Sequence, residues 1–171
     1  MKYLADLLSD HLDNYFNSLE KSAEVASIKA NQNAEVPNKI IISLLNMERE
    51  TGVGDSTSSR PFSSASLGHK NKPWFFNAYF VMAAVFDPKR YAESIEILSA
   101  AIEFLQTNYT FHPVKSLPFV VEPVTYSIQE LNNIWAMMGG HHYPAFFGKI
   151  KLLVYDGQQL KGVVSRISKT K

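Results

Sequence analysis

The chain has 171 residues, a formal net charge of +1 and no cysteine. This length can bury the core of one domain, and 46% hydrophobic with 19% charged residues is typical of globular rather than disordered proteins. The near-neutral charge favours neither nucleic acid nor an acidic surface, and the lack of cysteine excludes disulfides, thiolate catalysis and cysteine-based zinc sites.

The first segment, Lys2 to Leu19, has the apolar spacing of an amphipathic helix. Asp6, Asp10 and Asp13 occupy the face opposite the apolar stripe and would interrupt the core of a signal peptide, so we expect a cytosolic product. We expect the stripe to pack within the same chain. Its members are Leu4, Leu7, Leu8, Leu12, Tyr15, Phe16 and Leu19.

Two strand candidates and a polar segment follow. The sequence predicts a short strand at Glu24–Ala30 and a longer one at Lys39–Met47, which is rich in isoleucine and leucine. Because they are close in sequence, we expect them to form an antiparallel pair. The segment Thr51–Lys72 is dominated by serine, glycine and threonine, and we expect a mobile loop there.

The run Trp74–Phe86 is apolar except for Asn77, but it is shorter than the 18 or so residues of a membrane span. Both of its alternating sets are apolar, so we expect a strand in the middle of a sheet with both faces covered. Asp87 and Pro88 then suit the start of a helix that runs to about Asn108. The expected buried stripe of this helix is Tyr91, Ile95, Leu98, Ile102 and Leu105, with Ala101 and Phe104 beside it.

The last third alternates strands with one short helix. Phe119–Tyr126 lies between prolines and is expected at a sheet edge. A capping box, Ser127–Glu130, starts a helix that Gly139-Gly140 ends, and Asp156-Gly157 predicts a hairpin. Leu131, Ile134, Trp135 and Met138 should point inward from that helix, and the hairpin strands should be Phe146–Tyr155 and Leu160–Ile167.

The order of elements, α-β-β-β-α-β-α-β-β, predicts an α+β fold. We expect a single domain over residues 1–171, with a mostly antiparallel sheet covered by helices and a short tail at residues 168–171.

Signals for catalysis are weak. Gly52-Val53-Gly54 lacks the Gly-Lys-Ser/Thr ending of a phosphate-binding loop, and Ser56 would act as a nucleophile only with a strained turn and a partner such as His69. His141-His142 has no carboxylate at a ligand-like interval, which favours a structural turn over a metal site. We therefore predict no catalytic, cofactor-binding or metal-ligating residue.

Several segments together resemble a known family. They are IIISLLNMERE, the aromatic strand NKPWFFNAYFVMAAVF, the helix YAESIEILSAAIEFLQTNYTFHP, and ELNNIWAMMGGHHYPAFFGKIKLLVYDG. This order is similar to the N-terminal domain family of tail-terminator, or cap, proteins of contractile injection systems and phage-tail-like particles. Similar sequences often have Pro-Ser where this one has Pro144-Ala145.

The resemblance implies a structural role without cofactor or reaction. It implies a ring, expected to be a homohexamer, that ends the inner tube and anchors the last sheath layer. The partners would be the chain itself and the tube and sheath proteins, with neither nucleic acid nor membrane. Assembly in the cytoplasm would give a particle that is either released or membrane-attached.

A ring needs segments that become ordered when neighbours arrive. The candidates are the cationic and histidine residues of the Ser/Gly-rich loop and of the basic C-terminal segment. They are Arg60, His69 and Lys70 in the loop, and Lys161, Arg166 and Lys169 in the C-terminal segment. Two other functions stay open on the residues alone: a small hydrolase using Ser56 and His69, and a monomeric adaptor that binds a peptide at a sheet edge.

Overall fold

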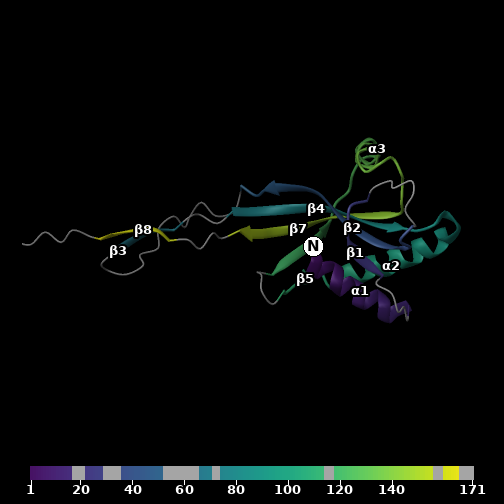
Figure 1. Ribbon diagram of the computed structural model, residues 1–171, viewed down its shortest axis with the longest axis horizontal. Coiled ribbons are helices and arrows are strands. Elements are labelled where there is room, and N and C mark those ends of the chain that lie inside the picture. The colour runs from purple at the N-terminus through teal and green to yellow at the C-terminus, as the bar shows by residue number, and fades with distance from the viewer. Residues whose placement is uncertain are drawn as a thin grey trace, which may run out of the picture.

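A six-stranded sheet between two layers of helix forms the body of the molecule in the computed structural model (Figure 1). The strand order is β1-β2-β4-β7-β6-β5, and a separate two-stranded sheet pairs β3 with β8. The structure describes residues 1–16, 22–28, 36–51, 66–70, 74–113, 118–155 and 160–165. The predicted α+β class with a mostly antiparallel sheet is confirmed.

The helices are α1 (Lys2–Phe16), α2 (Tyr91–Thr107) and α3 (Ile128–Met137), with a 3₁₀ turn at Pro88–Arg90. The strands are β1 (Ala23–Val25), β2 (Lys39–Arg49), β3 (Ser66–Lys70), β4 (Trp74–Val85), β5 (Thr110–Phe111), β6 (Phe119–Pro123), β7 (Ala145–Tyr155) and β8 (Leu160–Ser165).

Strand β4 lies in the interior of the sheet, between β2 and β7, as its two apolar faces predict. Phe80 and Met82 face the larger core beneath α1 and α2. Val81 and Ala83 face a smaller core that includes Trp135 of α3. All four side chains are buried, so burial on both faces explains the unusual run of apolar residues in this strand.

Helix α1 packs its predicted stripe into the larger core, where Leu4, Leu8 and Leu12 are fully buried. Ser9 is also buried, and its hydroxyl accepts the Ala23 N–H and donates to Asp13. Tyr15 is exposed, against expectation, and Leu19 lies outside the described residues.

The buried face of α2 differs from the predicted stripe. Tyr91, Ile95 and Ile102 are exposed. The helix instead turns a face containing small residues toward the sheet and α1, and small side chains let the elements approach closely. The buried residues are Ser94, Ile97, Leu98, Ala100, Ala101, Phe104 and Leu105.

Strand β1 pairs with β2 in parallel, so the expected antiparallel pair is wrong. The strand is also shorter than predicted, ending at Val25. Parallel strands need a crossover connection between them. Asn38 lies immediately before β2 with φ of 50°, and its side-chain oxygen accepts the N–H of Asp87.

Strand β6 lies between β7 and the short β5, not at the edge of the sheet. Pro123 is its last residue, at the end of the β7 ladder, and Thr110–Phe111 pairs with Val120 and Phe119 on the other side. Proline therefore ends this strand without excluding it from the interior of the sheet.

The predicted hairpin between β7 and the last strand is also wrong. Strand β8 pairs with β3, with Leu67 opposite Val164 and Lys70 opposite Leu160. Figure 1 shows this small sheet beyond the ends of β4 and β7, apart from the body. Part of the expected loop Thr51–Lys72 is therefore strand, while Asp156-Gly157 lies outside the described residues.

Candidate interaction surfaces

Helix α3 stands on the less covered face of the sheet. Its capping box forms as predicted: the Ser127 hydroxyl accepts the Glu130 N–H, and the Glu130 carboxylate accepts the Ser127 N–H. That backbone hydrogen bond, with the Ser127 hydroxyl, lowers the pKa of Glu130. Gly139 and Gly140 end the helix with positive φ, a conformation that glycine adopts without strain.

Only one side chain of α3, Trp135, is fully buried. Leu131 and Met138 are half-buried against the smaller core, whereas Met137 and Ile128 are 80% and 78% exposed. The side chains predicted to point inward from α3 were thus predicted correctly. Only one of them is fully buried, so α3 covers little of the sheet.

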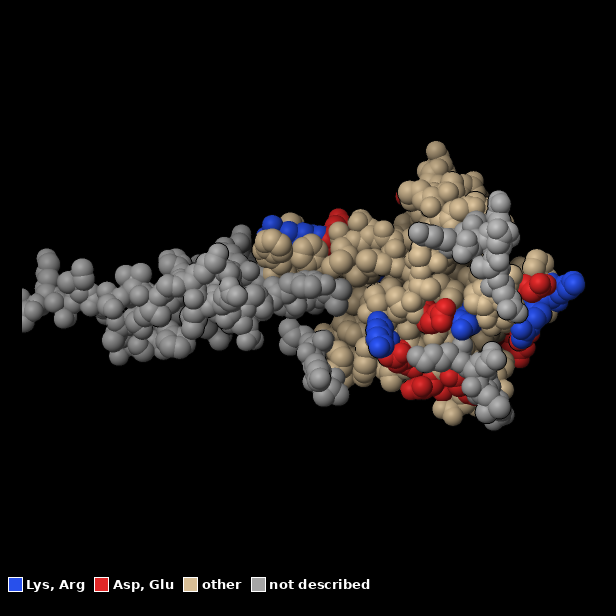
Figure 2. Space-filling model, in the orientation of Figure 1, with Lys and Arg blue, Asp and Glu red and all other residues tan. Residues whose placement is uncertain are grey.

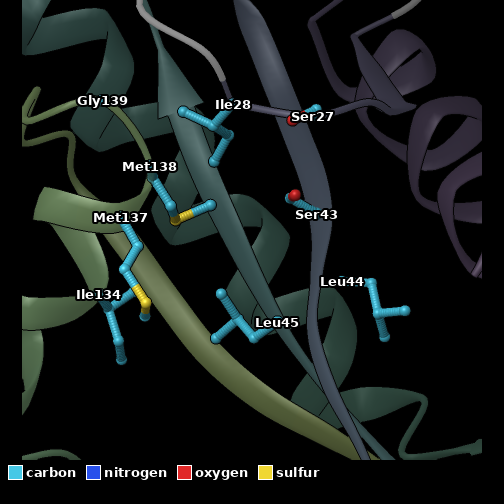
Figure 3. Close-up of a pocket in the computed structure, with 9 residues that line it drawn as sticks. All are labelled: Ser27, Ile28, Ser43, Leu44, Leu45, Ile134, Met137, Met138 and Gly139. Atoms are coloured by element: carbon cyan, nitrogen blue, oxygen red, sulfur yellow. The ribbon is translucent and has the colours of Figure 1, made fainter.

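An apolar groove runs between the end of α3 and strand β2 (Figure 3). Its volume is about 510 Å³, within the range of ligand pockets. Leu45 points toward Ile134 and Met137 across it, while Leu44 points away. The full lining is Ser27, Ile28, Ser43, Leu44, Leu45, Ile134, Met137, Met138 and Gly139. Sequence reasoning missed this groove, although the methionine pair at the helix end was a signal for it.

The outer ends of β2 and β4 carry a set of polar and aromatic contacts. The Tyr79 hydroxyl donates to Glu48, and this hydrogen bond raises the pKa of Tyr79. Arg49 lies 6.0 Å from the Trp74 ring centroid in a cation–π arrangement. Trp74 is nevertheless 56% exposed, so this end of the sheet offers an aromatic surface.

Charge is unevenly distributed over the body. Figure 2 shows acidic side chains gathered over α1, which carries Asp6, Asp10 and Asp13. On β6 and β7, Glu122 accepts from Lys151 at 3.0 Å and lies 3.3 Å from Lys149. The hydrogen bond from Lys151, aided by Lys149, lowers the pKa of Glu122.

The histidine pair lies at a second cavity of about 370 Å³, which Tyr91 and Phe86 also line. His142 packs 5.1 Å from Trp135, centroid to centroid, and His141 lies 6.3 Å from Tyr143. Among the described residues, no group of three or more histidine and acidic side chains could hold a metal ion. Both histidines are exposed and contact neighbouring aromatic rings after the glycine turn.

The predicted interaction residues fall at one end of the molecule or outside the described part. Lys70 is in β3 and Lys161 in β8, one residue from the Leu160 that pairs with Lys70, and His69 is also in β3. The pairing brings the loop and the C-terminal segment together, which sequence spacing could not show. Arg60, Arg166, Lys169 and Ser56 lie outside the described residues.

A family model matches nearly the whole chain, over residues 1–169: the Pvc16 N-terminal domain. The chain belongs to the Pvc16 N-terminal domain family. The resemblance inferred from the sequence motifs is therefore confirmed.

Two solved structures share the fold of this Pvc16 N-terminal domain. One is the PVC sheath/tube terminator of an extracellular contractile injection system in the extended state, with a TM-score of 0.56 and 13% identity. The other is the anti-feeding prophage cap, described as a tube terminating cap, with a TM-score of 0.60 and 12% identity. The matches cover 100% and 97% of this chain, but only 64% and 59% of those chains. No curated protein matches this sequence.

No helix in the described part of this Pvc16 N-terminal domain has both the length and the hydropathy to cross a bilayer. This agrees with the mixed composition of α1 and α2, each of which carries several acidic residues on its exposed face.

Proposed function

We propose that this chain is the structural tail terminator, or cap, of a contractile injection system. It forms a ring that ends the inner tube and anchors the last sheath layer. The observation that carries this proposal is the family match over residues 1–169, supported by two terminator structures with the same fold. The ring is a homohexamer, assembled in the cytoplasm into a phage-tail-like particle.

The shape of the molecule suits a head-to-tail ring. Such a contact joins two different patches of neighbouring subunits. The chain has the paired strands β3 and β8 at one end and the 3₁₀ turn with the start of α2 at the other (Figure 1). The two ends differ in structure, as a heterologous contact requires.

The residues proposed for contact with neighbours are Arg60, His69, Lys70, Lys161, Arg166 and Lys169. Of these, His69 and Lys70 lie in β3 and Lys161 in β8, while the other three lie outside the described residues. The pairing of Lys70 with Leu160 supports a joint role, because it concentrates cationic positions from two distant segments on one ladder. Cationic side chains would steer an acidic surface of the tube, sheath or neighbouring subunit toward this end.

Native mass spectrometry of the purified chain, alone and with tube and sheath proteins, tests the proposal. We expect hexamers, or hexamer formation on the ends of tubes. Electron microscopy should show tubes of uniform length with the chain and of broad length distribution without it. A chain that stays monomeric with both partners and leaves tube length unchanged would refute the proposal.

A matched pair of variants tests the contact residues. Lys161→Glu combined with Lys70→Glu should weaken binding to tube ends. Lys89→Glu is the control, because Lys89 is exposed and lies in the 3₁₀ turn Pro88–Arg90, outside the β3–β8 pair. Equal binding by both variants would exclude the β3–β8 end from the contact.

A further inference from the structure

Strands β3 and β8 continue the ladder of β4 and β7 beyond the six-stranded sheet. Trp74 lies opposite Tyr155 at the end of the β4–β7 ladder, and Lys70 lies opposite Leu160 in the β3–β8 ladder. Between these two pairs the chain advances by four residues on one side and by five on the other, so the register changes by a single residue. The β3–β8 pair, which we call the arm, therefore extends the sheet outward from the body (Figure 1).

The arm is a two-stranded sheet, and no third strand pairs with it in the part of the chain that the structure describes. A lone pair of strands is at best marginally stable in water. Packing against another surface would therefore stabilise the arm, and this need is the first observation that points to a partner.

Charge divides the chain between the arm and the body. Residues 56–73 and 157–171, which include both arm strands, contain seven Lys and Arg and no Asp or Glu. The whole chain has 17 Lys and Arg and 16 Asp and Glu, so the other residues hold 10 basic and 16 acidic side chains, a net charge of −6. A total charge near zero thus combines segments of +7 with a remainder of −6, and opposite charges of this size attract one copy to another.

Helix α2 presents an acidic and apolar surface to solvent. Ile95 and Ile102 are 40% and 39% exposed, and their spacing of seven residues places them on one side of the helix, two turns apart. Glu96 and Glu103 follow them directly and are exposed, and neither has an ion-pair partner among the described residues. We call these four residues the α2 face. It fits a partner that carries both apolar and cationic residues.

The chain itself supplies a segment of that composition. Leu160–Lys171 combines four Lys and Arg with Leu, Val and Ile and contains no acidic residue. We propose that the arm of one copy of this chain binds the α2 face of a second copy. This contact joins two different patches and is therefore heterologous. It names a subunit contact of the proposed ring and to that extent rests on the proposed function.

The positions of the arm and of α2 favour a contact between copies over one within a copy. The arm leaves the body at Trp74, whereas α2 begins at Tyr91, beyond the other end of β4. This strand has 12 residues and spans roughly 40 Å. Each copy in a pair then retains one free arm or one free α2 face, so the contact can repeat head to tail.

Sedimentation velocity of the full free chain, over a range of protein concentrations, tests the proposal. We expect self-association at about 50 mM NaCl that weakens at about 500 mM NaCl, because salt screens attraction between exposed charges. A chain that stays monomeric at every concentration and at both salt concentrations would overturn the proposal.

Two variants with reversed charge assign the contact to its two patches. The arm variant combines Lys70→Glu with Lys161→Glu, and the face variant combines Glu96→Lys with Glu103→Lys. Each should weaken self-association at least about tenfold, because like charges then oppose each other across the contact. Loss in the arm variant with full association of the face variant would assign the arm to another surface and overturn the proposal.

A matched control separates the α2 face from the overall charge of the body. Asp6→Lys combined with Asp10→Lys makes the same change of charge on α1, the other helix on this side of the sheet. This control should associate like the wild type. If it weakens association as much as the face variant does, the contact depends on net charge alone and the α2 face is excluded.

Mixing the arm variant with the face variant gives a further measurement. Each variant keeps one intact patch, so the mixture should form dimers of one copy of each and no larger species, as a heterologous contact requires. All four substitutions in one chain should restore association, which also shows that the substituted chains fold. A mixture that stays monomeric would overturn the proposal.

These outcomes are distinct from failure of the terminator function, because self-association is measured without tubes. A chain that associates through the arm and the α2 face but leaves tube length unchanged would retain this contact and lose the proposed function. A chain that caps tubes equally well as wild type, arm variant and face variant would retain the function and lose this contact.

Discussion

Gly148 of β7 lies directly opposite Phe80 of β4, and the space that its missing side chain leaves is filled by the ring of Phe80. A Cβ atom at Gly148 would come within 2.7 Å of Phe80 Cζ and 2.8 Å of a Phe146 ring carbon. The glycine is thus required by close approach across the ladder, in the larger core that holds the helices on the sheet.

Gly148→Ala should therefore destabilise the protein. Phe80 is fully buried and has no solvent into which to move, and overpacking of this kind costs about 1–3 kcal/mol. Urea denaturation measures the change in free energy of unfolding. The double variant Gly148→Ala with Phe80→Leu should regain part of the loss, and equal stability of Gly148→Ala and wild type would contradict the close approach.

Trp135→Ala should cost about 3–5 kcal/mol, because it removes the one fully buried side chain of α3. Helix α3 should then detach from the sheet more readily than α1 or α2, which hydrogen exchange measures as faster exchange confined to residues 128–138. Met137→Ala, on the exposed side of the same helix, is the control and should change stability by less than about 0.5 kcal/mol.

Ser127→Ala removes the N-cap of α3 and should cost about 1 kcal/mol of stability. The Glu130 N–H would lose its side-chain acceptor, and the Glu130 carboxylate would lose the Ser127 hydroxyl as a donor. Thermal unfolding at pH 7 measures the effect. Ser99→Ala in α2 is the matched control: its hydroxyl bonds only back to the Ile95 carbonyl, so its loss should be neutral or slightly stabilising.

Glu122→Gln should reduce the loss of stability that the wild type shows as the pH falls into the acid range. The folded-state pKa of Glu122 lies below its usual 4.5, chiefly because Lys151 donates to it. The contribution of ionised Glu122 to the free energy of unfolding is therefore fully present above pH 4.5. It is lost as the pH falls through the lower folded-state pKa. The effect should be small, because the pair is partly exposed.

Urea midpoints measured between pH 2 and 7 check this prediction. Glu96→Gln serves as the comparison, because Glu96 is exposed and finds no ion-pair partner among the described residues. If the urea midpoints of both variants depend on pH as those of the wild type do, the ion pairs of Glu122 do not contribute to stability.

Local patterns predicted individual elements well wherever one signal dominated. The nearly continuous apolar run of β4 correctly predicted a strand in the interior of the sheet with both faces buried, because both of its alternating sets of side chains are apolar and pack into the two cores. The capping residues Asp87 and Ser127 correctly marked the starts of helical segments, because a cap acts within three residues.

The wrong predictions concern tertiary contacts: which face of a helix is buried and which strands pair. Hydrophobicity placed Tyr91, Ile95 and Ile102 inside, but the small residues Ala100, Ala101 and Ser94 allow closer packing and took the buried face. Nearness in sequence likewise favoured an antiparallel β1–β2 pair and a β7–β8 hairpin. In the structure, β1 pairs with β2 in parallel, and β8 pairs with β3.

The amino-acid sequence alone determined the α+β class, the interior position of β4 and the family, because these depend on periodicity and motifs that are written along the chain. Only the tertiary structure decided which strands pair, which face of α2 is buried, and that a groove lies between β2 and the end of α3. These relationships join residues up to about a hundred positions apart, and their free energy comes from packing that no local pattern contains.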